Sequence, residues 1–230
     1  MTPTSVLFWD IDGTLLSTSR AGVFALEEAV LEVGGSRLDL AGLHTAGRTD
    51  HEIAVQVLRE AGVSDSAAQA SALLRAYERH LPERLGWRAG GALAGVVEVL
   101  DHLANRDHVV SLLLTGNTKA GAAAKLAHYG LASYFAGGAF CADGEDRAAI
   151  GRRALENAAE HVDGPVDLER VFVIGDTPAD IRVGKAIGAR TVAIATGPYE
   201  ASELEAHDPW LALERLPDPP RFAELLTLGA

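Results

Sequence analysis

Two carboxylates, Asp10 and Asp12, lie at the end of an apolar run at 6–9 and are followed directly by Gly13. Side chains of an extended chain alternate between two faces, so Asp10 and Asp12 should point the same way. Neighbouring negative charges repel, and such a pair usually shares a proton or a cation. The pair could bind Mg²⁺ or supply a nucleophile and a general acid/base. A simple aspartate–glycine turn after a strand is the alternative.

A second polar group, Thr115, Gly116 and Asn117, follows the apolar run at 109–114. A hydroxyl, an unhindered backbone amide and a side-chain amide together could bind phosphate oxygens. Thr and Asn also cap helices well, so a helix start is the competing explanation.

A third polar group, Asp176 and Asp180, follows the apolar run at 171–174. Pro178 suits the first turn of a helix, and an aspartate near a helix start is favourable by itself. Taken by itself, this group could therefore be explained by helix capping. The recurrence of acidic or amide side chains after three separate apolar runs indicates one shared site.

The elements that must position these residues follow an alternating pattern. The apolar runs are continuous, as in a parallel sheet covered on both faces, and lie at 6–9, 109–114, 171–174 and 191–195. Helical patterns lie at 91–105, 118–129, 147–160 and 178–187. The alternation predicts a doubly wound, mainly parallel, Rossmann-like α/β sheet. Ligands bind beyond the carboxyl ends of strands in such sheets, where all the polar groups above would meet.

The interval 17–87 has no convincing strand and reads as an inserted helical cap. One helix should end at the glycine pair 34–35, and a second should run from a Thr/Asp cap to Gly62. A third should stop before Pro82. The predicted core comprises the remaining residues, 1–16 and 88–230, and an apolar tail segment after the stretch LPDPP should pack on it.

Composition excludes several classes of protein. The 230 residues carry a formal net charge of −12 with no run of Lys or Arg, which argues against nucleic acids and anionic membranes as partners. No signal peptide or membrane-spanning stretch is recognisable, so we expect a cytoplasmic protein. The single cysteine, Cys141, excludes an intrachain disulfide and is expected to be a small buried residue.

The stretches DIDGT, TGN and GDTPAD resemble three motifs of the haloacid dehalogenase-like (HAD) hydrolase superfamily. Their order and the helical insert are most similar to phosphoglycolate-phosphatase-like members, and the resemblance covers nearly the whole chain. It implies a Mg²⁺-dependent phosphomonoesterase acting on a small phosphorylated metabolite, as a monomer or homodimer. The motif set is specific for the superfamily and does not identify the substrate.

The resemblance also implies roles for individual residues. Asp10 would attack phosphorus and form an aspartyl-phosphate, and Asp12 would protonate the leaving oxygen and then activate water. Mg²⁺ would be held by Asp10, the backbone carbonyl of Asp12, and Asp176, with Asp180 orienting the metal's ligands. The residues that would bind the transferring phosphoryl group are Thr115, Gly116, Asn117 and Arg147.

Arg147 is the residue expected to replace the lysine that the family usually carries in its third motif. No lysine lies between Lys125 and Lys185, and Arg147 begins the predicted helix at 147–160. An arginine supplies a permanent charge and paired donors for phosphoryl oxygens.

Other basic residues are weaker candidates. Arg152 and Arg153 fall in mid-helix, and Lys119 and Lys125 follow the TGN stretch too closely and are expected to face solvent.

The stretch TAGRTD at 45–50 resembles the loop by which such caps approach the substrate. Arg48 could bind a carboxylate or a second phosphate there, or it could be a solvated arginine at a helix start. His44 and His51 flank the loop and are expected to lie at the surface.

Two alternative functions remain open. A sugar phosphomutase of the β-phosphoglucomutase kind would share Asp10 and Asp12. The second alternative is a non-catalytic phosphate- or metal-binding protein; the intact Asp10, Asp12, Thr115 and Asp176 argue against it, and the unusual third motif leaves room for it. Haloacid dehalogenases that resemble this chain lack the second aspartate, and phosphonate hydrolysis in the family needs a cap lysine, which the interval 17–87 lacks. We therefore do not expect either of those two reactions.

Overall fold

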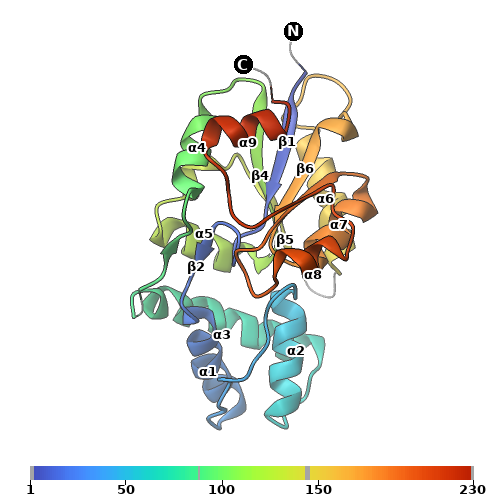
Figure 1. Cartoon of the computed structure of the whole chain (residues 1–230). Helices are drawn as coiled ribbons and strands as arrows, with labels where there is room; N and C mark the ends of the chain where they lie inside the picture. The colour runs from blue at the N-terminus through green and yellow to red at the C-terminus, as the bar shows by residue number, and fades with distance from the viewer. Residues whose placement is uncertain (1–2, 88, 143–145, 229–230) are drawn as a thin grey trace.

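A six-stranded parallel sheet forms the centre of the computed structural model, which describes residues 3–87, 89–142 and 146–228 (Figure 1). The strand order is β5-β4-β1-β6-β7-β8, and every neighbouring pair is parallel. The strands are β1 (Ser5–Trp9), β4 (Val109–Thr118), β5 (Gly138–Cys141), β6 (Val171–Gly175), β7 (Arg190–Ile194) and β8 (Leu211–Leu213). The predicted doubly wound parallel sheet is confirmed.

Helices cover both faces of this sheet because alternate strand residues point to opposite sides. Leu7 and Trp9 pack on the face formed with α4 (Val96–Ala104), α5 (Lys119–His128) and α9 (Pro219–Leu225). Val6 and Phe8 pack on the other face, with α6 (Arg147–Ala158) and α7 (Pro178–Ile187). The short helix α8 (Ala201–Glu205) packs beside β7 through Leu204 and Ala193.

Three helices, inserted after β1, form a separate layer beneath the carboxyl edge of the sheet (Figure 1). They are α1 (Ala21–Gly34), α2 (Asp50–Glu60) and α3 (Ala67–Leu85), and their buried residues form a hydrophobic cluster of their own. The two chain crossings between this cap and the core pair as antiparallel strands, β2 (Leu16–Ser17) and β3 (Gly91–Ala92). The helical insertion is confirmed, and the exact boundaries 17 and 87 stay a prediction.

Some of the predicted helix and strand boundaries are wrong, because tertiary packing overrides the local helix and strand propensity of the sequence. α3 continues through Pro82 because Leu81 and Leu85, on either side of it, are buried in the cap cluster. The segment expected as a helix from residue 91 first forms β3, and α4 begins only at Val96. Two edge strands, β5 and β8, were not expected from the sequence, and both are short and only partly buried.

Two smaller expectations concern the surface. Cys141, expected to be buried, is only half-buried at the end of β5. None of the helices in the described ranges combines the length and the apolar composition that crossing a membrane requires.

The apolar tail segment packs on the core as expected, through Phe222 of α9. Phe222 and Trp9 are both fully buried, and their ring centroids lie 5.8 Å apart. The tail therefore closes one face of the sheet directly over β1, the strand that carries Asp10 at its end.

We expect Phe222→Ala to lower the free energy of unfolding by about 3–5 kcal/mol, because it removes a fully buried aromatic ring and leaves a cavity beside Trp9. Urea denaturation followed by tryptophan fluorescence measures this change. The matched control is Arg221→Ala on the same helix, which removes only an exposed ion pair to Glu224 and should cost less than about 1 kcal/mol. Equal effects of the two substitutions would show that the tail does not stabilise the core.

Candidate active site

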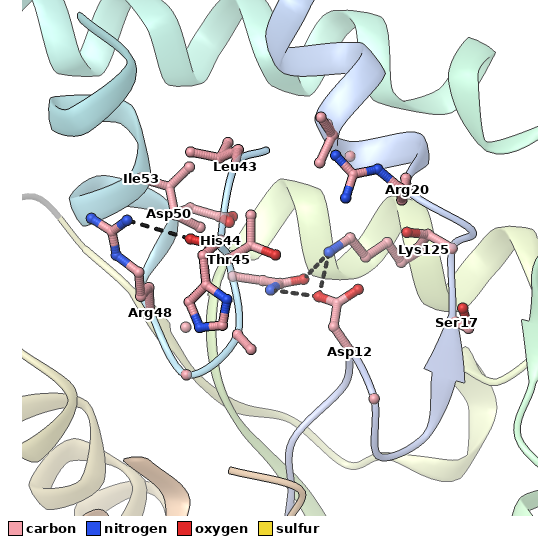
Figure 2. Close-up of a pocket in the computed structure, with 18 of the residues that line it drawn as sticks. Asp12, Ser17, Arg20, Leu43, His44, Thr45, Arg48, Asp50, Ile53 and Lys125 are labelled. Atoms are coloured by element: carbon pink, nitrogen blue, oxygen red, sulfur yellow. Dashed lines mark hydrogen bonds and ion pairs between the residues drawn. The ribbon is translucent and has the colours of Figure 1, made fainter. Parts of the chain in front are cut away.

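The three predicted polar groups meet at the carboxyl edge of the sheet, where β1 lies between β4 and β6. From β1 the chain runs to β4 and then β5 on one side, and from β5 it crosses over to β6 on the other side. Such a reversal of strand order is the point where α/β sheets bind ligands. A pocket of about 340 Å³ lies here between core and cap (Figure 2). Its core lining includes Asp10, Asp12, Gly116, Asn117, Lys125, Arg147 and Asp176.

Asp10 and Asp12 both line this pocket, while Ile11 between them is fully buried in the core. The alternation expected from an extended chain therefore places the two carboxylates in one pocket. Gly13 follows with φ +83°, and a Cβ at this position would lie 2.3 Å from Asp176 Oδ2. Glycine is needed here both for the turn and for the close approach of Asp176.

The carboxylates of Asp10, Asp176 and Asp180 form a buried cluster in which one oxygen of each lies within 4.8 Å of the others. Burial, and next the Asp180 carboxylate, raise the pKa of Asp10 to about 6. Burial, followed by the charges of Asp180 and Asp10, raises the pKa of Asp176 well above its usual range. Burial and the shared negative charge thus make Asp10 and Asp176 harder to ionise.

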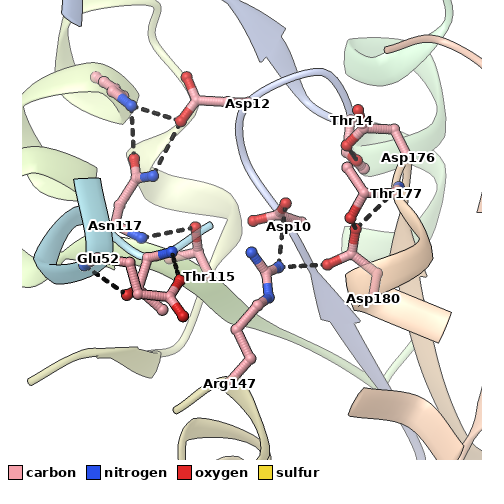
Figure 3. A network of polar contacts seen from close by, with 12 residues as sticks. Asp10, Asp12, Thr14, Glu52, Thr115, Asn117, Arg147, Asp176, Thr177 and Asp180 are labelled. Atoms are coloured by element: carbon pink, nitrogen blue, oxygen red, sulfur yellow. Dashed lines mark hydrogen bonds and ion pairs between the residues drawn. The ribbon is translucent and has the colours of Figure 1, made fainter. Parts of the chain in front are cut away.

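Arg147 is the cation that faces this cluster. It begins α6, whose N-cap Asp146 accepts a hydrogen bond from Ala149 N at 2.7 Å. Its Nη2 donates to Asp180 Oδ1 and lies 3.4 Å from Asp10 Oδ2 (Figure 3). The side chain is only 10% exposed. The arginine expected from the sequence therefore lies directly beside Asp10.

The cluster has the charge and the donor atoms to hold a divalent cation. Three carboxylates and one guanidinium carry a net charge of −2 when all are ionised, which a divalent cation would neutralise. Carboxylate oxygens are the ligands that Mg²⁺ prefers. Asp180 is already engaged, since it accepts from Arg147 and from Thr177 N at 3.0 Å. Asp10 and Asp176 are therefore better placed to ligate a metal, and Asp180 to orient its surroundings.

Asp12 faces a different cation, Lys125 of α5. Lys125 Nζ donates to Asp12 Oδ2 (Figure 2) and, at 2.7 Å, to Asn117 Oδ1. Its side chain is 5% exposed, so the expectation that Lys125 faces solvent is wrong. Burial is the largest single influence and opposes its charge, but Asp12, Tyr77 and Asp50 together outweigh burial and keep the lysine pKa above its ordinary value. In the described structure, Asp10 and Asp12 therefore each have a cation of their own.

The TGN stretch is not explained by helix capping. Thr118, one residue later, is the N-cap of α5, and its Oγ1 accepts from Gly121 N at 3.1 Å. Thr115 is fully buried beside Asp10, to which its side chain is hydrogen-bonded. A Cβ on Gly116 would lie 2.6 Å from the backbone oxygen of Arg48, so this glycine lets the cap loop approach the core.

Helix capping explains only one of the two aspartates in the GDTPAD stretch. Asp180 forms a capping box with Thr177 at the start of α7, as the capping explanation requires. Asp176 makes no such cap, and its Oδ1 accepts instead from Thr14 Oγ1 at 3.0 Å. Capping accounts for Asp180 but leaves Asp176 to be explained by the site.

The cap contributes Arg48, which borders the pocket but is held by its own loop and helix (Figure 2). Its guanidinium donates to Gln56 Oε1 and, at 3.1 Å, to the backbone oxygen of Glu52. His44 beside it is exposed, as expected, and also lines the pocket. Arg48 would have to leave these partners to bind a substrate.

Asp50 is a cap residue that the sequence did not single out. It begins α2, is buried, and accepts from Thr118 N of the core at 2.7 Å. Burial raises its pKa to about 6 despite the charge of Lys125. An aspartate in the first turn of a helix is usual, so no sequence signal distinguishes this contact between cap and core.

Residues 7–185 match the family model described as haloacid dehalogenase-like hydrolase. Solved structures share the fold over 98–99% of this chain and 99–100% of their own. They include a predicted phosphatase from Clostridium acetobutylicum (14% identity, TM-score 0.74) and a predicted phosphoglycolate phosphatase from Haemophilus somnus (15%, 0.70). A provisionally named β-phosphoglucomutase from Thermotoga maritima is also similar (18%, 0.62). No curated protein sequence is detectably similar to this chain.

We expect the cation-free protein to lose stability as the pH rises from about 4 to about 6. The pKa of Asp10 is about 6 in the folded protein and near 3.8 in an unfolded chain, so the folded state binds more protons in this window. Asp176, whose pKa is also raised, acts in the same direction. Thermal midpoints measured in EDTA across this range test the expected slope.

Asp176→Asn should raise the thermal midpoint of the cation-free protein by roughly 3–6 °C at pH 7, because it removes one of three repelling carboxylates. It should also abolish any rise in the midpoint that Mg²⁺ causes in the unchanged protein. The matched control is Asp208→Asn, the same chemical change at a side chain that is 94% exposed. A lower midpoint for Asp176→Asn, with the Mg²⁺ response intact, would contradict the proposed metal position.

Proposed function

The chain belongs to the haloacid dehalogenase-like hydrolase family, and we propose that it is a Mg²⁺-dependent phosphomonoesterase. Its substrate would be a small phosphorylated metabolite, hydrolysed through an aspartyl-phosphate on Asp10. The observation that carries the proposal is the buried cluster of Asp10, Asp176 and Asp180 with Arg147 beside it. We further propose that it acts as a monomer or homodimer and without a nucleic-acid or membrane partner.

Asp10, Asp176 and the backbone carbonyl of Asp12 would hold the metal. When bound, Mg²⁺ would neutralise the repulsion between the Asp10 carboxylate and the phosphate oxygens. The Arg147 guanidinium carries a permanent positive charge and contacts Asp10. It can therefore stabilise the negative charge that develops on the phosphoryl oxygens. Thr115, fully buried and hydrogen-bonded to Asp10, keeps the nucleophile in place.

The reaction would take two steps. A carboxylate oxygen of Asp10 attacks phosphorus, the bond to the leaving oxygen breaks, and Asp12 gives that oxygen a proton. Asp12, now a carboxylate, then takes a proton from water, which attacks the phosphorus and releases phosphate from Asp10. The separate partners of the two aspartates support this division, because Asp10 contacts Arg147 while Asp12 contacts Lys125.

The cap would exclude water and select the leaving group. The pocket volume of about 340 Å³ favours a small molecule. The cap side offers an apolar wall opposite the charged core, formed by Val23, Leu26, Leu43, Ile53 and Tyr77. Closure over such a wall removes water and strengthens the electrostatic contacts on the core side.

Phosphate release from p-nitrophenyl phosphate, acetyl phosphate and a panel of small phosphorylated metabolites tests the proposal. We expect activity with Mg²⁺ that is lost in EDTA and abolished by Asp10→Asn, with Asp208→Asn as the matched control. Transfer of phosphate between sugar positions without its release would identify a phosphomutase instead. Equal inactivity of the wild type and Asp10→Asn across the panel would favour a non-catalytic binding protein.

Arg147→Ala should lower kcat on the order of 10³-fold with the fold intact, because an arginine contact to a transferring phosphoryl group can contribute that much. Arg147→Lys should recover part of the loss, since it keeps the charge and loses the paired donors. Arg152→Ala, an exposed arginine on the same helix, is the control. Near-normal turnover of Arg147→Ala would move the role to another cation.

A further inference from the structure

The hydrogen bonds around Lys125 fix the orientation of two neighbouring side chains. A lysine ammonium can only donate, so the Asn117 atom 2.7 Å from Nζ must be its oxygen, Oδ1. The Asn117 amide nitrogen therefore points the other way and donates to Asp12 Oδ2 at 3.0 Å. Lys125 donates to that same oxygen. Asp12 Oδ2 thus receives two hydrogen bonds, and Oδ1 receives neither of them (Figure 2).

Lys125 is enclosed by groups from both layers of the protein. Asp12 and Asn117 face it from the core, and Asp50 of α2 and Tyr77 of α3 lie close enough to affect its charge from the cap. The phosphoryl-binding roles assigned above do not use this buried cation. Its direct contacts are to Asp12 and to the residue that also binds Asp12.

We propose that Lys125 is a positioning residue for Asp12: with Asn117 it holds Oδ2, so that the transferable proton resides on Oδ1 and faces the leaving group. An oxygen that accepts two hydrogen bonds is a poor place for a proton, which leaves Oδ1 as the donor. This inference rests on the proposed function, because it concerns the residue that would protonate the leaving oxygen.

The chemical step balances without a further reactant. The bond from Asp10 to phosphorus forms, the bond from phosphorus to the leaving oxygen breaks, and the proton on Asp12 Oδ1 moves to that oxygen. The leaving group departs as an alcohol, and Asp12 becomes a carboxylate facing the ammonium of Lys125. Lys125 thus stabilises the charge that appears on Asp12 as the proton leaves.

Lys125→Met tests the proposal through the dependence of kcat/KM on the leaving group, in a series of aryl phosphates from p-nitrophenyl to phenyl phosphate. Good leaving groups need no proton, and poor ones do. We expect the variant to lose less than about 10-fold on p-nitrophenyl phosphate and on the order of 10²-fold on phenyl phosphate, so the slope steepens. The matched control, Lys119→Met, changes an exposed lysine at the start of the same helix and should keep the wild-type slope.

An equal loss on every substrate, or no loss, would overturn the proposal, because a merely structural role lowers all rates alike. Circular dichroism and the thermal midpoint establish that Lys125→Met is folded. If it is not, Lys125→Gln is measured in its place, and the slope should steepen less because the amide still donates. A failure of the proposed function itself would give a different result, because wild type and Asp10→Asn would then be equally inert on p-nitrophenyl phosphate. That result would overturn the Lys125 proposal as well.

Discussion

The need to balance buried negative charge shapes this end of the molecule. Three almost fully buried carboxylates, Asp10, Asp50 and Asp176, line one pocket with half-buried Asp12, and buried Asp180 lies beside Asp10 and Asp176. Among the described residues that line this pocket, Arg147 and Lys125 are the buried cations. Arg147 sits among the cluster that would hold the metal, and Lys125 sits between Asp12 and the cap. Because each cation serves a different set of acids, Asp10 and Asp12 lie in different electrostatic surroundings, as the proposed nucleophilic and acid/base roles require.

The sequence was a good guide wherever a single strand or helix carries the signal. Continuous apolar runs identified the four inner strands, and the polar residues that follow them were brought to one edge by the parallel topology. Arg147 was expected from its place at a helix start, and it lies beside Asp10. Which residue ligates a metal and which orients the ligands stays a prediction.

What the sequence missed depends on contacts between distant segments. Lys125 looks like a surface lysine on a helix, and its burial results from Asp12, 113 residues earlier, and from the cap that covers it. Asp50 looks like a first-turn aspartate, and only the assembled structure brings it to Thr118. Local patterns also could not separate capping from site residues, which the hydrogen bonds of Thr118 and Asp180 do separate.

The pairing of β2 with β3 has a consequence for how such a protein can diversify. Leu16 lies opposite Ala92, so the outgoing and returning chains pass side by side. A segment of any size can be spliced between two adjacent crossings without shifting the register of the central sheet, because loop-closure entropy rises only slowly with length. The cap, proposed above to select the leaving group, can thus be exchanged while the proposed phosphoryl chemistry of the core is inherited unchanged.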